Sequence, residues 1–317
     1  MKNPKQGLLL FLKGMAMGGA DVVPGVSGGT IAFITGIYEE LLNSIKSFDL
    51  TALRLLLKFE LKKFWQHING SFLTILLSGI ALSLITLSRI TIYLLQAYPI
   101  QLWSFFFGLI IISAIIVARE ITKWKAEVYI AGIIGIAIAF YISIATPAET
   151  PTNLGFIFFS GALAICAMIL PGISGAFILL IMGKYEYILN ALRNFDFVVI
   201  LTFILGCVVG LLSFAKVISW LLKNYYNLTI ALLAGFMVGS LNKIWPWKFI
   251  TQYRIDSHGI PKPFLDRNVM PHIYEDLTGM QPHILAAILF MLFGIAIVYF
   301  IDKYAAKKTI GVTNDRL

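Results

Sequence analysis

The chain has 317 residues, of which 59% are hydrophobic and 13% charged, and its mean hydropathy is +0.85. A soluble domain carries roughly 25% charged residues, so a soluble globular protein is excluded, and at about 20 apolar residues per crossing the length allows about six to eight helical spans. The net charge is +9. In a membrane protein, the distribution of Lys and Arg among the loops indicates which loops face the cytoplasm. No nucleic-acid partner is expected.

The first half of the chain, 1–150, begins with two apolar arms, 8–23 and 30–45, separated by Pro-Gly-x-Ser-Gly. An arm of about 16 residues is about 24 Å long as a helix, short for a bilayer core of about 30 Å. We therefore predict a re-entrant hairpin over 8–45.

Segment 50–71 alternates apolar and basic residues at helical spacing, which predicts an amphipathic helix on anionic cytoplasmic lipid or, alternatively, a partner-binding helix. Apolar runs predict spans over 72–95, 100–118 and 128–146.

The second half, 151–317, follows the same plan. A second hairpin is expected over 155–192, with arms 155–170 and 177–192 around another Pro-Gly-x-Ser-Gly. Spans are expected over 197–222, 228–245 and 283–301, with a polar outer insertion at 248–282. The predicted fold is thus an all-α integral membrane protein in which each half combines a re-entrant hairpin with about three transmembrane helices.

An internal repeat connects the two halves. Residues 14–49 align without gaps onto 161–196, and 15 of these 36 positions are identical, including Pro-Gly-x-Ser-Gly, Tyr-Glu and Phe-Asp. Weaker similarity pairs 88–98 with 215–225 and 135–142 with 294–301. Because each half has an odd number of spans, the second repeat must be inverted relative to the first.

The basic residues agree with this topology. Fifteen of the 25 Lys and Arg residues fall in segments assigned to the cytoplasm and six in outer segments, as the positive-inside rule requires. The N-terminal segment interrupts its apolar stretch with Lys13, so it is interpreted as part of the fold and not as a signal peptide. We predict a multi-pass protein of the cell membrane with both termini in the cytoplasm.

Four basic residues lie within the apolar segments. An embedded cation costs at least about 2.5 kcal/mol on insertion scales, so it is a functional candidate by default. Arg89 and Lys216 occupy equivalent positions in the two repeats and are the first candidates for substrate binding; Lys13 and Lys184 are secondary. The alternative is that Arg89 and Lys216 extend to water at a nearby interface.

The two motif loops are the second set of candidates. A helix that begins at mid-membrane leaves free N–H groups, which are tolerated only where they face a cavity or a ligand. Two such helix starts predict an anion site for phosphate; the alternative is that the loops only shape and cap the hairpins. The candidate substrate-binding residues are Gly25, Ser27, Gly28, Gly172, Ser174 and Gly175.

Acidic residues accompany the same motifs. Asp21 lies three residues before Pro24, and Met168 takes its place in the second half. Glu39 and Glu186 are repeated, each after a tyrosine. These carboxylates are candidates for coupling to a proton or sodium ion, or for neutralising a nearby cation.

Cysteine and histidine give no sign of a metal, a cofactor or a disulfide. Cys166 and Cys207 lie in apolar runs and are interpreted as small core residues, and the four histidines fall in polar connectors without metal-ligand spacing. No catalytic residue, metal or cofactor is predicted.

The motif sequences resemble a known family. GADVVPGVSGGTIA at 19–32 and ILPGISGAF at 169–177 resemble a bacterial and archaeal membrane family, formerly of unknown function, that is associated with transport of polyprenyl phosphate, the undecaprenyl phosphate carrier recycled in cell-wall synthesis. The resemblance implies a flippase that returns this lipid from the outer to the cytoplasmic leaflet, driven by an ion gradient. Ala176 and Phe177 replace Gly29 and Thr30, which argues against equal roles for the two loops.

Two other functions remain open from the residues alone. A transporter of a small soluble anion or ion would need a closed, water-filled cavity without an opening to lipid. A membrane enzyme acting on lipid phosphate would need a nucleophile with a base or a metal cluster, and no membrane-facing histidine is expected that could supply one.

Overall fold

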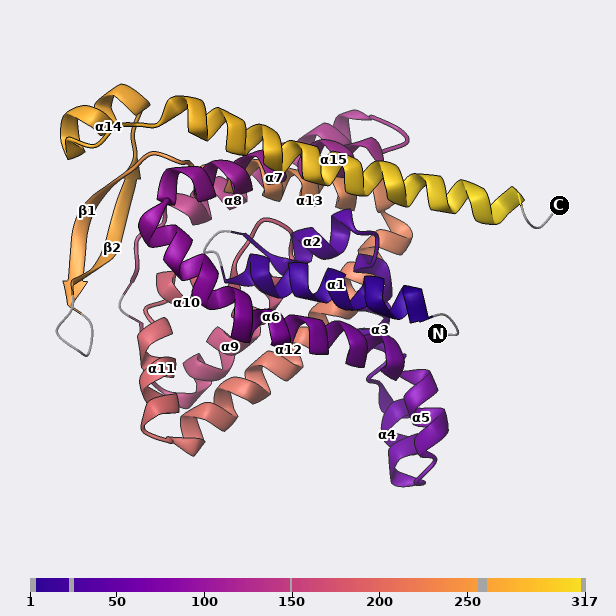
Figure 1. Ribbon diagram of the computed structural model, residues 1–317. Helices are drawn as coiled ribbons and strands as arrows, with labels where there is room; N and C mark the ends of the chain where they lie inside the picture. Colours follow the sequence, from indigo (N-terminus) through magenta and orange to yellow (C-terminus); the bar gives the residue numbers. More distant parts are fainter. Residues whose placement is uncertain (1–3, 23–25, 149, 256–260, 315–317) are drawn as a thin grey trace.

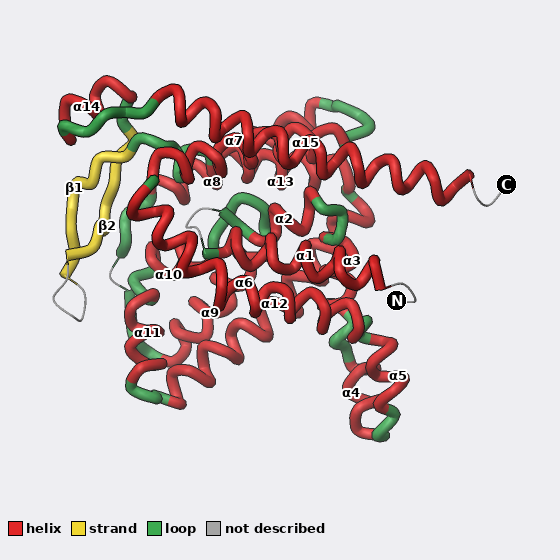
Figure 2. The backbone as a smooth tube through the Cα atoms, viewed as in Figure 1, coloured by secondary structure: helices red, strands yellow, loops and turns green. Residues whose placement is uncertain are grey.

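A computed structural model describes the chain except for residues 1–3, 23–25, 149, 256–260 and 315–317. It consists of helices and one two-stranded antiparallel ribbon (Figures 1 and 2). The first half contains α1 (Pro4–Asp21), α2 (Gly28–Ile34), α3 (Tyr38–Lys46), α4 (Leu50–Leu57), α5 (Leu61–His67), α6 (Gly70–Ala97), α7 (Pro99–Arg119) and α8 (Ala126–Ile144). The second contains α9 (Leu154–Ile169), α10 (Gly175–Ile181), α11 (Tyr185–Arg193), α12 (Phe197–Asn224), α13 (Tyr226–Ser240), β1 (Lys248–Ile255), β2 (Pro261–Asn268), α14 (Pro271–Thr278) and α15 (Ile284–Asn314).

The predicted all-α membrane architecture is confirmed. Within the described residues, five helices are long and apolar enough to cross a membrane: α6, α7, α8, α12 and α15. The fifth expected span, 228–245, corresponds to α13, which has 15 residues and ends at Ser240. At about 1.5 Å per residue α13 is about 22 Å long, so it is shorter than a bilayer core.

Both hairpins are more broken than the sequence predicted. The arms expected over 30–45 and 177–192 are each divided into two helices, α2 with α3 and α10 with α11. The second pair is bent by 103°. Gly36 and Gly183, which are equivalent in the repeat, lie at the two breaks with φ values of +68° and +62°. Because glycine adopts this left-handed conformation without steric cost, it ends a helix and redirects the chain.

The two polar insertions also differ from simple helices. The prediction of one continuous amphipathic helix over 50–71 is wrong. This segment forms two helices, α4 and α5, which pack on each other. Phe59 separates them, and its φ of +55° is incompatible with a continuous helix. Asp49 caps α4 by accepting hydrogen bonds from the N–H groups of Thr51 and Ala52. The insertion expected over 248–282 forms β1, β2 and α14.

Repeated glycines allow the long helices to pack closely. A β-carbon at Gly14 would lie 2.3 Å from the Leu76 oxygen of α6, and one at the equivalent Gly161 would lie 2.5 Å from the Phe203 oxygen of α12. The same arrangement recurs where α7 meets α15 and where α8 meets α13, through Gly108, Gly294, Gly135 and Gly235. Small residues give membrane helices their closest contacts. The halves therefore share one packing scheme as well as one sequence pattern.

The two cysteines take part in the α9–α12 contact. Both are free, and each thiol points at a backbone oxygen of the opposite helix: Cys166 at that of Gly210 and Cys207 at that of Gly161. They serve as small packing residues, as expected from their apolar surroundings.

The course of the chain separates the polar elements into two groups. Both described chain ends and the α4–α5 pair lie at one end of the molecule, on the right of Figure 1, whereas β1, β2 and α14 lie at the opposite end. Helices α6 and α12, which are equivalent in the repeat, cross the molecule in opposite directions (Figure 1). An inverted repeat requires this opposite course, and the inversion itself stays a prediction.

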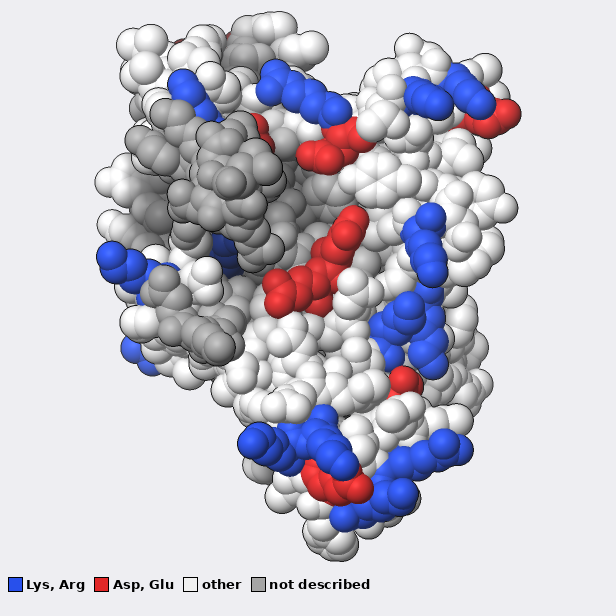
Figure 3. Space-filling view, turned by 90° about the vertical axis from the view of Figure 1, so that its right-hand side faces the viewer, with Lys and Arg blue, Asp and Glu red and all other residues white. Residues whose placement is uncertain are grey.

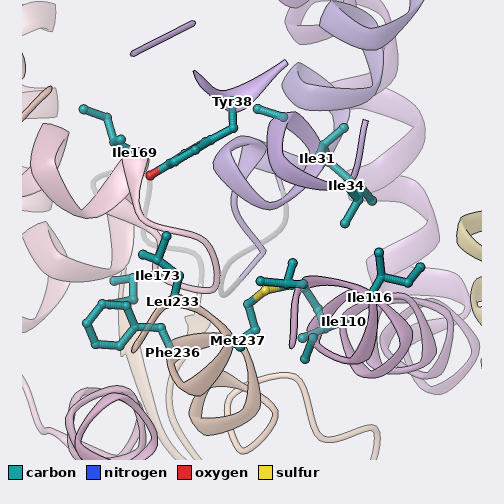
Figure 4. Close-up of a cluster of buried hydrophobic side chains, with 14 of the residues drawn as sticks. Ile31, Ile34, Tyr38, Ile110, Ile116, Ile169, Ile173, Leu233, Phe236 and Met237 are labelled. Carbon is teal, nitrogen blue, oxygen red and sulfur yellow. The ribbon is translucent and has the colours of Figure 1, made fainter. Parts of the chain in front are cut away.

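The core lies where the first hairpin meets α7 and α13. Figure 4 shows Ile31, Ile110, Leu233 and Met237 converging from α2, α7 and α13. Three of these side chains are fully buried and Ile31 is 6% exposed. This cluster fixes α2, and with it the first motif loop, in the interior.

Candidate substrate site at the two motif loops

The two motif loops meet inside the protein. Ser27 donates a hydrogen bond from Oγ to the Met168 oxygen over 3.0 Å, and the Gly172 N–H donates to Thr30 Oγ1 over 3.0 Å. A β-carbon at Gly29 would lie 2.4 Å from the Ile169 oxygen. Loops that are separated by more than 140 residues are therefore in direct contact.

The start of α2 is capped by the protein's own side chains. The Gly28 N–H donates to Asp21 Oδ1 over 2.6 Å, and the Gly29 N–H donates to Ser27 Oγ over 3.0 Å. A carboxylate is thus held where the sequence suggested a bound anion, at the positive end of a helix. Ser27 is the N-cap of α2.

The second loop is built differently. Met168 stands where the first loop has Asp21, and Ser174, the N-cap of α10, makes no capping hydrogen bond with its side chain. Gly172 has a φ of +84°, and a β-carbon there would lie 2.9 Å from Met237 Cα. Ser174 and Gly175 are buried. The loops are therefore unequal, and only the first carries a carboxylate.

A largely apolar groove of about 420 Å³ runs past the first loop. Its walls come from α1, α3 and α6 on one side and from α9 and α12 on the other. Asp21, Gly28 and Tyr38 line it. Leu77 of α6 and Val208 of α12 also line it and are 55% and 45% exposed, so the groove reaches the outer surface of the helices.

Tyr38 provides a polar group in this groove. Its side chain is 3% exposed, and its hydroxyl has no hydrogen-bond partner among the described residues. Figure 4 shows the hydroxyl directed toward Ile169, next to the meeting point of the loops. A buried hydroxyl without a partner costs about 1–3 kcal/mol, so its position is unfavourable unless a ligand contacts it.

The secondary cations hold the bends of the hairpins. Lys13 Nζ donates to the Thr35 oxygen over 2.5 Å, at the break between α2 and α3. Lys184 is 2% exposed, donates to the Thr150 oxygen over 2.7 Å, and lies near the ring of Tyr187. Each has a structural role, and their roles in transport stay predictions.

Other sequence-predicted residues lie away from the loops. Arg89 on α6 and Lys216 on α12 are exposed, and neither lines the groove. Glu39 lines a separate cavity of about 290 Å³ with Lys46 and Lys223. Glu186, in the first turn of α11, is partly buried. Gly25, together with Pro24, lies outside the described residues.

Sequence reasoning missed two residues of this site. Thr30 joins the loops through its hydroxyl, and the only signal was that Phe177 occupies the equivalent position. The sequence presents Tyr38 only as part of the repeated Tyr-Glu pair, yet Tyr38 is buried whereas Tyr185, its equivalent, is 39% exposed. A sequence repeat does not show that two equivalent residues differ in burial.

Comparison with known proteins agrees with these features. Residues 17–262 match the VCA0040-like family, described as undecaprenyl phosphate translocase-like. The chain is 46% identical over 300 residues, 95% of its length and 97% of the relative's, to a protein of Vibrio cholerae named polyprenyl-phosphate transporter. It is 35% identical over 255 residues, 74% of its length and 85% of the relative's, to a protein of Staphylococcus aureus with the same name. No solved structure matches the chain.

Both names denote a transporter and not an enzyme, as the sequence predicted. The match covers both motif loops and most of the helices that position them, and the first relative extends over nearly the whole chain. The chain therefore belongs to the undecaprenyl phosphate translocase-like family.

Proposed function

We propose that this protein transports polyprenyl phosphate across the membrane. The observation that carries the proposal is the groove of about 420 Å³ that leads from the exposed surface of α6 and α12 to Asp21 and Gly28 at the motif loops. Its lining is almost entirely apolar, which suits an isoprenoid chain. The alternative of a small soluble anion requires a closed aqueous cavity, and this groove favours the lipid.

Alternating access is the proposed mechanism. The halves share the contacts of α1 with α6 and of α9 with α12, but they differ elsewhere: α3 contacts α12 of the other half as well as α6 of its own, whereas α11 contacts α12 of its own half. If the two hairpins exchanged their packing, α11 would contact α6, and the site would open toward the other leaflet. Two near-equivalent packings of one repeated unit are the usual basis of such exchange.

The proposed direction is from the outer to the cytoplasmic leaflet, with both termini in the cytoplasm. Figure 3 looks onto the end of the molecule from which α4 and α5 project, and blue Lys and Arg side chains gather there. These two helices and the turn between them contribute Arg54, Lys58, Lys62 and Lys63. Anionic cytoplasmic lipid attracts such a cluster, which supports this orientation.

Transport itself is tested with purified protein in liposomes. Labelled polyprenyl phosphate is placed in the outer leaflet, and its transfer is followed while pH and sodium gradients are varied separately. We expect transfer to require the protein and to accelerate with one of the two gradients. Transfer at the rate of protein-free liposomes would contradict the proposed function.

Arg89 and Lys216 are proposed to hold the phosphate during transfer. Both are exposed on helices predicted to face lipid, where a cation is costly. We expect Arg89→Ala or Lys216→Ala to lower the transport rate at least about tenfold, the effect of losing one charge-assisted hydrogen bond. The double variant should be inactive.

Folding should survive these changes, because neither side chain forms an ion pair or hydrogen bond with the described residues. Arg119→Ala, at the exposed end of α7, is the control and should transport normally. Transport by the double variant at the wild-type rate would remove both residues from the mechanism.

The hydroxyl of Tyr38 is proposed to bind the substrate in the groove. We expect Tyr38→Phe to lower the transport rate about two- to tenfold, the effect of one neutral hydrogen bond. Thermal stability should be unchanged or higher, because the substitution removes a buried hydroxyl without a partner. Tyr185→Phe, at the exposed equivalent position, is the matched control. A Tyr38→Phe variant with normal transport would assign the residue to packing alone.

A further inference from the structure

A second polar cavity lies at the end of the molecule that carries the ribbon. It has a volume of about 390 Å³ and lies between the ends of α8 and α13, helix α10 and the ribbon β1–β2. Its lining includes Ser143, Phe177, Asn242, Lys243, Asp266 and Arg267. We call it the vestibule. None of its charged residues belongs to the site at the motif loops.

Cations outnumber carboxylates in and beside the vestibule. Lys243 Nζ lies 3.2 Å from Asp266 Oδ1, and Lys248 Nζ lies 3.4 Å from Asp266 Oδ2. Two ammonium groups therefore share one carboxylate, and the guanidinium of Arg267, near the ring of Phe249, adds a third positive charge. The four groups carry a net charge of about +2 when ionised, which an anion entering the cavity would balance.

Burial makes this surplus of positive charge unfavourable unless an anion balances it. The side chain of Lys248 is 10% exposed, and Nζ lies 4.4 Å from the centre of the Trp103 ring. Burial lowers the pKa of Lys248 to about 8, although Asp266 acts in the opposite direction. Lys243 is 19% exposed and lies 4.7 Å from the centre of the Phe177 ring. An ammonium group has three donors, and Lys243 uses one of them on Asp266, so others remain for a ligand.

The vestibule adjoins the second motif loop. A small cavity of about 10 Å³ lies beside the vestibule and is lined by Gly172 and Ser174 of the second loop. The two cavities share three lining residues: Ser143, Phe177 and Lys243. Phe177 and Lys243 thus separate the vestibule from the place where the two loops meet. A ligand bound at Lys243 would be next to the loop.

We propose that the vestibule binds a phosphate monoester group, with Lys243 and Arg267 as its ligands and with Asp266 and Lys248 as positioning residues. A phosphate monoester carries a charge of about −1.5 to −2 at pH 7, which matches the surplus. The identification of the ligand as the head group of a transported lipid rests on the proposed function. Free phosphate has the same chemistry, and the two sources are distinguished below.

The test measures binding to the purified full-length protein in detergent. The probes are geranyl phosphate, as a short polyprenyl phosphate, and inorganic phosphate. We expect Lys243→Ala and Arg267→Ala each to weaken geranyl phosphate binding about tenfold or more, as loss of a charge-assisted hydrogen bond does. Lys243→Arg keeps the charge and should bind within about threefold of wild type. Lys125→Ala, an exposed lysine before α8, is the control.

The outcomes separate this proposal from the proposed function. Wild-type affinity in both Lys243→Ala and Arg267→Ala would overturn the vestibule as a binding site, while transport in liposomes would leave the function intact. Binding of inorganic phosphate alone, with the same dependence on Lys243 and Arg267, would support a phosphate site but overturn its assignment to the lipid. Loss of binding in Lys243→Ala but also in Lys243→Arg and Lys125→Ala would indicate general damage and would count against the proposal.

Discussion

Gly29→Ala is expected to abolish transport. The added β-carbon would lie 2.4 Å from the backbone oxygen of Ile169, and a backbone atom cannot move aside as a flexible side chain can. Overpacking of this kind costs about 1–3 kcal/mol, and separation of the loops would also break the hydrogen bonds of Ser27 to Met168 and of Gly172 to Thr30. Transport of labelled polyprenyl phosphate in liposomes is the measurement, with a thermal melt to follow stability.

Gly155→Ala is the matched control. Gly155 is the second residue of α9 as Gly29 is of α2, but its added β-carbon would have only one ordinary contact, 3.5 Å from Asn153 Oδ1. This variant should fold and transport normally. If Gly29→Ala transported as well as Gly155→Ala, close contact of the loops would not be needed for transport.

Asp21→Asn is expected to uncouple transport from the ion gradient while the fold is retained. The amide oxygen of asparagine can still accept the hydrogen bond from the Gly28 N–H, which Asp21 Oδ1 accepts over 2.6 Å. What the substitution removes is the charge and the exchangeable proton. We expect lipid to equilibrate between leaflets without accumulating, and measurements with separate pH and sodium gradients would identify the ion.

Three further variants separate capping from coupling. Asp21→Ala leaves the Gly28 N–H without its acceptor and should destabilise the protein by about 1–3 kcal/mol, whereas Asp21→Asn should not. Glu39→Gln and Glu186→Gln test the other two carboxylates. Gradient-driven accumulation that persists in Asp21→Asn and disappears in Glu39→Gln or Glu186→Gln would move the coupling role away from Asp21.

Much of the helical framework was predictable from apolar runs. The expected spans 72–95, 100–118 and 128–146 agree with α6, α7 and α8 to within two residues at each end. Long uninterrupted apolar stretches are identified well because a membrane requires every backbone polar group in them to be bonded within a helix. The last helix was underestimated, since α15 continues to Asn314 beyond the apolar stretch that ends near 301.

The polar insertions were predicted less well. The amphipathic helix expected over 50–71 is two short helices, and the polar outer insertion expected over 248–282 is a β-ribbon followed by a helix. Both lie outside the long apolar runs, where chain direction depends on single residues such as Phe59 and on pairing between strands. Hydrophobic periodicity gives little information about such local decisions.

The sequence by itself determined that this is a membrane protein, that it is duplicated, and that two Pro-Gly-x-Ser-Gly motifs interrupt its helices. Composition and repetition suffice for these conclusions because each depends on many residues at once. Only the tertiary structure decided that the loops touch through Ser27 and Thr30, that Asp21 caps α2, and that Tyr38 is buried while Tyr185 is exposed. The physical reason is that equivalent residues in a repeat meet different neighbours once the two halves pack against each other.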